Sequence, residues 1–276
     1  MTRYAEFDHE AMSDALEQAF ATRVRRLDEL PGYSFCSKDL LHEGTREAIL
    51  HEQATQQGLE LGGAGSTAVG TLFAKRYSVM IMAVISAFTM YDALLHIEEG
   101  GVRIELNGAG GMWYETWLER YVGVDAGANK AADFVHREKE VRLLRERLHL
   151  HLHRVFQSVA DATGASVKVM NSLVAHNVQQ LAAHILHDPS IYRNEQRLVL
   201  VKHDMNIWLE QQKENIFGST FQCFEHFNGN DAPLLIRRYC CLAYKIGDGH
   251  HAHSYCNSCP KLDSESRLRQ WINKGT

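Results

Sequence analysis

Apolar side chains recur at helical spacing along most of the chain. The longest stripe has successive spacings of 3, 4, 4, 3 and 4 residues and predicts one helix over about 129–163; its members are Val141, Leu144, Leu148, Leu152, Val155 and Val159. Gly164 follows directly and suits the C-terminal end of that helix. Similar stripes predict helices at 8–30, 39–57, 68–95 (as one helix or two), 166–187, 193–214 and 263–273.

Signals for β-structure are fewer and shorter. Leu94–Ile97 and Val102–Leu106 flank a Glu-Glu-Gly-Gly sequence, which predicts a β-hairpin. A further strand is expected near Met112–Trp117, and Leu234–Ile236 predicts another late in the chain. The aromatic-rich stretch 217–227 is expected to be a strand or a loop.

Small residues at 124–129 interrupt the pattern and mark a predicted boundary. Before it lies a mixed α/β N-terminal part, residues 1–125, which contains helices and the hairpin. After it lies a mainly helical C-terminal part, residues 126–276. We expect these two parts to be the organisation of the chain.

Composition and charge are those of an ordinary soluble globular protein. Of the 276 residues, 45% are apolar and 23% are charged, which allows a substantial core. The formal net charge of −5 argues against general nucleic-acid binding. The N-terminus lacks the apolar core of a signal peptide. The longest uncharged run, Tyr77 to Tyr91, is a fifteen-residue stretch, shorter than the roughly 18–20 residues that span a bilayer. We therefore expect a buried core helix, no transmembrane segment and a cytoplasmic protein, with at most a loose association with the inner face of the membrane.

Four of the six cysteines fall within residues 240–259. Cys240 and Cys241 are adjacent, and after fourteen residues Cys256 and Cys259 follow with C-x-x-C spacing. Without a secretory signal, such a concentration of thiols favours a metal centre over disulfides. Zinc takes four thiolates in a closed tetrahedron. A [2Fe–2S] cluster also takes four, shared between two irons.

The adjacent pair bears on the choice of metal. Successive side chains of an extended strand point to opposite faces, so Cys240 and Cys241 reach one site only if the backbone bends there. Structural zinc sites mostly use pairs spaced like Cys256 and Cys259, whereas a binuclear cluster accepts thiolates from different directions. From the residues alone, zinc and iron–sulfur both remain open.

This stretch resembles the C-terminal signature of the FhuF-type ferric siderophore reductases. The resemblance rests on Arg-Arg-Tyr-Cys-Cys at 237–241, on Tyr244 and on Tyr-Cys-Asn-Ser-Cys-Pro at 255–260, which together span under a tenth of the chain. It implies that Cys240, Cys241, Cys256 and Cys259 are the ligands of a [2Fe–2S] cluster. The gap of fourteen residues is longer than is usual in that family.

The resemblance also implies a fold and a function. The fold would be α+β: a mixed N-terminal part with helices and a small antiparallel sheet, then a mainly helical C-terminal part that carries the cluster. The function would be cytosolic reduction of ferric siderophores of the hydroxamate or citrate–hydroxamate type. These chelators hold Fe(III) with hard oxygen donors and hold Fe(II) far more weakly, so a single electron releases the iron. No nicotinamide or flavin fingerprint is present, so we expect a separate electron donor such as a ferredoxin or a flavin- or NAD(P)H-dependent reductase.

Substrate contacts are predicted on both sides of the cysteine doublet. Arg237 and Arg238 carry planar guanidinium groups that suit the paired oxygens of an iron chelate; alternatively, they balance the charge of the thiolates. His250, His251 and His253, inside the cysteine gap, are candidates to shield the cluster or to donate hydrogen bonds to a bound anion.

Other sequence features are assigned no function. His149, His151 and His153 lack the glutamate of a zinc-hydrolase motif and are expected as solvated or core-edge side chains. Cys36 and Cys223 are expected as buried small apolar side chains.

No nucleophile or paired-carboxylate arrangement is found, so no catalytic residue is expected beyond the cluster. Two other classes of protein stay open. One is an electron carrier or redox sensor without a siderophore site, and the other is a non-enzymatic module held together by zinc.

Overall fold

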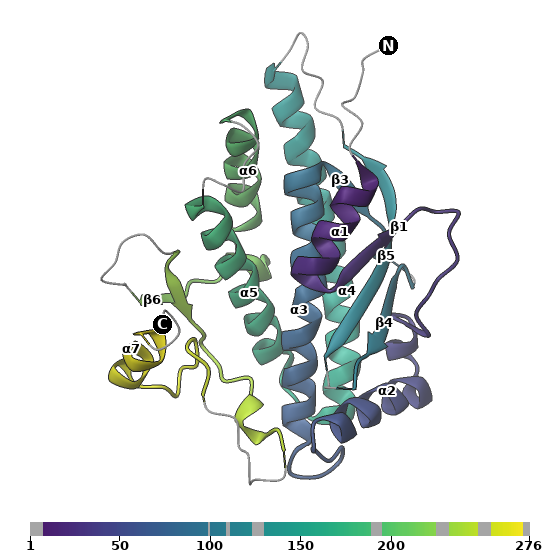
Figure 1. Cartoon of the computed structure of the whole chain (residues 1–276), viewed down its shortest axis with the longest axis vertical. Coiled ribbons are helices and arrows are strands. Elements are labelled where there is room, and N and C mark those ends of the chain that lie inside the picture. The colour runs from purple at the N-terminus through teal and green to yellow at the C-terminus, as the bar shows by residue number, and fades with distance from the viewer. Residues whose placement is uncertain are drawn as a thin grey trace.

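Within the residues that the computed structural model describes, the chain has an α+β fold with seven α-helices, a mixed five-stranded sheet and a two-stranded antiparallel sheet (Figure 1). The described residues are 8–98, 100–108, 111–122, 130–188, 195–224, 232–247 and 255–272. The helices are α1 (His9–Phe20), α2 (Glu43–Gln56), α3 (Ser66–Tyr91), α4 (Lys130–Thr163), α5 (Val167–His187), α6 (Glu195–Trp208) and α7 (Ser264–Ile272). The strands are β1 (Thr22–Arg25), β2 (Phe35–Cys36), β3 (Ala93–Leu95), β4 (Val102–Leu106), β5 (Met112–Tyr121), β6 (Gln222–Phe224) and β7 (Leu234–Ile236). Short 3₁₀ turns are η1 (Asp39–Leu41), η3 (Ile216–Gly218) and η4 (Ala243–Lys245).

Helix α3 is the centre of the fold. Figure 1 shows it beside α4 along the long axis, with the sheet on one side and α5 and α6 on the other, and it contacts all of these elements. By length and composition α3 is the one described helix that could span a bilayer, yet 78% of its most apolar window is buried inside the protein. The predicted core helix is therefore confirmed, as a single helix.

The large sheet differs from the predicted small antiparallel sheet. Its strand order is β1-β5-β4-β2, and β1 runs parallel to β5, so the sheet is mixed. The predicted hairpin of Leu94–Ile97 with Val102–Leu106 is wrong. Both β3 and β4 instead pair antiparallel with β5, β3 against residues 118–121 and β4 against residues 112–116.

The predicted helix at 8–30 is also wrong beyond Phe20. Ala21 adopts a left-handed conformation (φ 46°), and its amide N–H caps the helix by donating to the carbonyl oxygens of Glu17 and Leu16. The chain then enters β1, where Thr22 and Val24 are buried and alternate with less buried neighbours. Val24 satisfies both the helical and the strand period, so the spacing of apolar residues alone could not separate them.

The later helices were predicted more closely. The long helix ends at Thr163, and Gly164 has a φ of +67° and donates its amide N–H to Ala160, as expected of a C-terminal cap. Helices α5, α6 and α7 lie within the predicted ranges, and β7 coincides with the predicted strand. The boundary predicted between residues 125 and 126 lies in 123–129, outside the described residues.

Beyond α6 the chain runs along the outer side of α5. Strand β7 pairs with β6 and contacts α5, and η4 contacts α3. Figure 1 shows this C-terminal segment, in yellow-green and yellow, lying beside α5 and the lower part of α3. A small apolar cluster there consists of Leu72 of α3, Leu173 of α5 and Cys241, so two core helices form the floor on which the cysteine segment rests.

Candidate metal centre

The backbone bends directly after the cysteine doublet. Strand β7 ends at Ile236, and Leu242 adopts a left-handed conformation with φ 62°, which is rare for a bulky residue. The amide of Leu242 donates to the sulfur of Cys240 at 3.4 Å. Thr71 of α3 donates its hydroxyl to the carbonyl oxygen of Cys241 at 2.9 Å. This turn, which sequence reasoning required for a shared site, lets adjacent cysteines face one region.

The second cysteine pair sits on a tight turn. The amide of Cys259 donates to the carbonyl oxygen of Cys256 at 2.8 Å. Arg267 of α7, only 4% exposed, braces this turn by donating to three carbonyl oxygens. These belong to Asn257 (2.8 Å), Cys259 (2.9 Å) and Leu262 (2.7 Å). Helix α7 thus holds the C-x-x-C segment against the doublet.

The four sulfurs form two close pairs. The Sγ atoms of Cys240 and Cys259 are 3.5 Å apart, and the side chains of Cys241 and Cys256 interact closely enough to shift each other's pKa. Within the described part of the chain, no third cysteine sulfur lies within 4.8 Å of both members of a pair. Cys241 and Cys259 are 1% exposed, whereas Cys240 and Cys256 are half-buried. The four predicted ligands are therefore close in space, arranged as two pairs with one partly accessible member each.

Arg237 lies against these sulfurs. Its side chain is buried, with 3% exposure, and its Nη2 contacts the sulfur of Cys256. Its Nη1 is buried and has no hydrogen-bond partner among the described residues. Burial lowers the pKa of Arg237, but the sulfurs of Cys241, Cys256 and Cys259 raise it above its ordinary value. Among described residues, the negative partners of this guanidinium are cysteine sulfurs.

The charge balance favours a thiolate at Cys241. The hydrogen bond from Cys256 lowers the pKa of Cys241 to about 4, and the positive charges of Arg237 and Lys75 act in the same direction. The same hydrogen bond raises the pKa of Cys256. Burial raises the pKa of Cys240.

Two further cations were missed by sequence reasoning. Lys75 and Arg76 of α3 are half-buried, Lys75 acts electrostatically on both Cys241 and Cys256, and Arg76 acts on Cys241. Burial lowers the pKa of Arg76. The sequence did carry a signal: these are the two charged residues in the 26-residue span of α3. A charge pair in an otherwise uncharged core helix calls for an anionic partner.

A cleft opens beside the cysteine segment. It has a volume of about 490 Å³ and lies between β6, β7 and the start of α7. Arg237, Arg238 and Arg267 line it together with a single carboxylate, that of Asp263. Arg238 is exposed and donates to the carbonyl oxygen and hydroxyl of Thr220, with its guanidinium over the ring of Phe221. The two predicted arginines therefore differ: Arg237 faces the sulfurs, and Arg238 is exposed at the cleft.

The remaining predicted residues are placed as follows. His250, His251 and His253 lie in 248–254, outside the described residues. Tyr244 and Tyr255, near the predicted ligands in sequence, form an edge-to-face ring pair with centroids 5.2 Å apart.

The predicted burial of the two isolated cysteines is not observed. Cys223 is exposed on β6, a strand in which Gln222 is also exposed and Phe224 is half-buried. Cys36 is half-buried on β2.

No protein-family model matches the chain, and a comparison with curated proteins finds no match. The function of the chain is therefore inferred from its own residues.

Proposed function

We propose that Cys240, Cys241, Cys256 and Cys259 bind a [2Fe–2S] cluster and that the protein is a ferric siderophore reductase. The substrate would be an Fe(III) chelate of hydroxamate or citrate–hydroxamate type, docked in the cleft beside the ligands. When bound, such a cluster supplies one electron at a time, which is the number needed to convert ferric to ferrous iron.

The observation that carries the proposal is the environment of Arg237. A buried guanidinium without an anionic partner is strongly unfavourable. Here three cysteines, Cys241, Cys256 and Cys259, act on it and no carboxylate among the described residues pairs with it, so we infer that its anionic partner is a set of thiolates. Thiolates in this number are stable next to one another when they share a metal centre. Lys75 and Arg76 add two more compensating charges.

The pairing of the sulfurs supports a binuclear cluster over zinc. With Zn–S bonds of about 2.3 Å, a tetrahedral zinc site would hold all four sulfurs about 3.8 Å from one another. Two close pairs set apart instead suit a cluster that divides its thiolates between two irons.

The protein's own residues have three roles in this proposal. The cysteines bind the cluster, with Cys240 and Cys256 on the more accessible side. Arg237 and the charges of α3 stabilise the negative centre. Arg238 offers its guanidinium to the oxygen donors of a chelate at the mouth of the cleft, which has a net positive lining. Electrons arrive from a separate reductase or ferredoxin, and the ferrous ion leaves because the chelator binds it weakly.

The first experiment tests the metal. Protein purified anaerobically should contain two irons and two acid-labile sulfides, as expected of this cluster type, and its visible absorption should bleach with dithionite. Serine at any one of the four cysteines should abolish that spectrum. Cys223→Ser is the matched control, because Cys223 is an exposed cysteine outside the motif. A colourless protein with one zinc, or a normal spectrum after Cys240→Ser or Cys241→Ser, would refute the assignment.

The second experiment tests the substrate. Dithionite-reduced protein freed of excess reductant is mixed with a ferric hydroxamate chelate and, separately, with a ferric citrate–hydroxamate chelate. Reductase activity predicts an oxidation rate that saturates with chelate concentration, together with stoichiometric ferrous iron. A cluster that is intact but oxidised without saturation would identify an electron carrier or redox sensor instead.

A further inference from the structure

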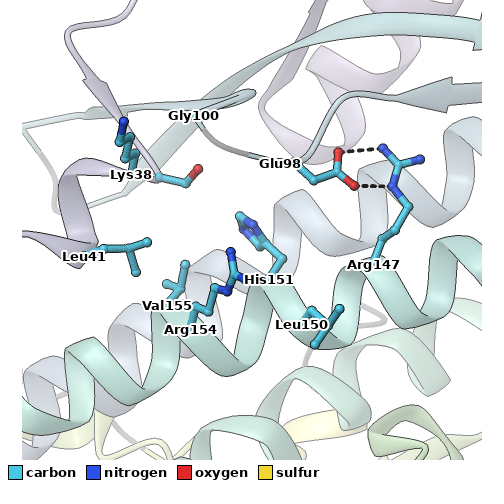
Figure 2. Close-up of a pocket in the computed structure, with 10 residues that line it drawn as sticks. Lys38, Leu41, Glu98, Gly100, Arg147, Leu150, His151, Arg154 and Val155 are labelled. Atoms are coloured by element: carbon cyan, nitrogen blue, oxygen red, sulfur yellow. Dashed lines mark hydrogen bonds and ion pairs between the residues drawn. The ribbon is translucent and has the colours of Figure 1, made fainter.

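A second pocket lies between α4, η1 and the segment that joins β3 to β4 (Figure 2). Its volume is about 430 Å³, within the range of small-molecule sites. It shares no lining residue with the cleft beside the cysteines. Figure 2 shows His151 and Arg154 projecting from α4 into it, with the pair of Glu98 and Arg147 toward one end and Lys38 toward the other.

The lining is positively charged beyond what its own carboxylate neutralises. Arg147 is bound by Glu98 and, outside the pocket, by Glu119. Lys38 and Arg154 also line the pocket, and neither forms an ion pair with another described residue. Two exposed cations are thus left facing one concave surface, where a bound anion would be attracted to both.

His151 adds a neutral donor. Its Nε2 lies 2.7 Å from the hydroxyl of Tyr77, which is fully buried and has no other hydrogen-bond partner among the described residues. A buried hydroxyl proton needs an acceptor, so Nε2 accepts from Tyr77. The ring proton of the neutral imidazole is then on Nδ1, the nitrogen that Tyr77 does not use. Burial lowers the pKa of His151 to about 4, which keeps the ring neutral at physiological pH.

One wall of this pocket is apolar, and two of its side chains are exposed to solvent. Leu41 and Leu150 are 42% and 58% exposed, and Val155 lies between them in the lining. Apolar walls with a few convergent polar groups are typical of sites for small organic molecules.

We propose that this pocket binds a small organic oxyanion, a carboxylate or a phosphate monoester. Its charged oxygens contact the Nδ1–H of His151 and the guanidinium of Arg154, with Lys38 nearby. Its apolar body lies against the two leucines. This site is separate from the cysteine centre, so the proposal does not depend on whether that centre binds iron.

The test is calorimetric titration of the full-length protein with phenyl phosphate, with benzoate and with the neutral benzyl alcohol. At least one of the two anions should bind saturably, and more tightly than benzyl alcohol. Binding of phenyl phosphate alone would identify a phosphate site, and binding of benzoate alone a carboxylate site. Arg154→Gln should weaken the binding anion about tenfold, the loss expected for one charge-assisted hydrogen bond. Lys139→Gln is the matched control and should leave the affinity unchanged, because Lys139 is exposed on the same helix, lies outside the pocket lining and forms no ion pair with another described residue.

A nitrogen-15 spectrum of the histidine rings tests the geometry separately. His151 should carry its proton on Nδ1, and the near-isosteric Tyr77→Phe should release it to the Nε2-protonated form. The proposal is overturned if neither anion binds more tightly than about 10 mM, if Arg154→Gln binds as tightly as the unmodified protein, or if benzyl alcohol matches both anions.

Discussion

At the scale of single residues, neighbouring arginines have opposite environments. Arg237 is buried against the cysteine sulfurs, and Arg238 is exposed at the cleft. The sequence presents them as one Arg-Arg pair with two alternative roles, charge balance and substrate contact. Their burial suggests that each residue has one of the two roles.

We predict that Arg237→Met loses most of the bound iron, because the negative centre is left without its buried countercharge. Arg238→Met should keep the iron and raise the chelate concentration at half-maximal rate about tenfold, since one bidentate contact is lost. The measurements are iron content and oxidation rate against chelate concentration. Equal iron content in the two variants would contradict the assignment.

His151 should make the stability of the protein depend on pH. Burial lowers its pKa from the ordinary 6.5 to about 4 in the folded state. Between these values the unfolded chain binds more protons, so the free energy of unfolding falls as the pH falls from about 6.5 to about 4. His151→Gln should remove up to about 3 kcal/mol of this decline, measured by urea unfolding at several pH values. His153→Gln, exposed on the same helix, is the control. If the free energy of unfolding varies with pH in the same way in the His151 variant and in the unmodified protein, His151 is not the source of the decline.

At the scale of elements, the shortest described helix positions half of the candidate ligands. Helix α7 was predicted from its apolar spacing, but nothing local shows that Arg267 would turn inward to three carbonyl oxygens of the preceding turn. Arg269, two residues later, is exposed and pairs with Glu265 instead.

We predict that Arg267→Met loosens the C-x-x-C turn, because three buried or partly buried carbonyl oxygens lose their donor at about 1 kcal/mol each. The amide protons of Cys259 and Leu262 should exchange at least about tenfold faster, and iron should leave faster to a ferrous chelator. Arg269→Met on the same helix should change neither rate. Hydrogen exchange can be measured in protein without metal. Unchanged exchange rates would therefore refute the stabilising role of Arg267 independently of the cluster.

At the scale of the whole molecule, a buried ion network joins three helices. Arg137 of α4, 1% exposed, donates to Asp204 of α6 at 2.7 and 2.9 Å and to Asp92 at the end of α3 at 2.7 Å. Arg197 of α6 completes the network by pairing with Asp92 at 2.6 Å. The network fixes α3, the helix under the cysteine segment, relative to α4 and α6.

Arg137→Met should lower the free energy of unfolding by about 3–5 kcal/mol, because it leaves buried carboxylates short of their countercharge. Arg142→Met on the same helix removes pairs with the partly exposed Glu138 and Glu210 and should cost less than about 1 kcal/mol. Urea unfolding of both variants at neutral pH makes the comparison. Similar losses would mean that the buried network contributes no more than the surface pairs.

The sequence by itself determined the helices with long apolar stripes, the cap at Gly164, the strand before the cysteines and the grouping of the cysteines themselves. These follow from spacing over a few residues, and such spacing is readable along the chain. It failed at β1, because the strand that pairs with β1 lies far along the sequence. It failed at the expected hairpin, because β3 pairs with β5 instead of with its neighbour β4, and only the sheet selects that partner. The tertiary structure alone decided that Lys75 and Arg76 of the core helix lie near Cys241, that Arg267 braces the second cysteine pair, and that the sulfurs meet as two pairs. Whether these side chains meet depends on how the helices and turns pack against one another, and no local pattern of spacing encodes that packing.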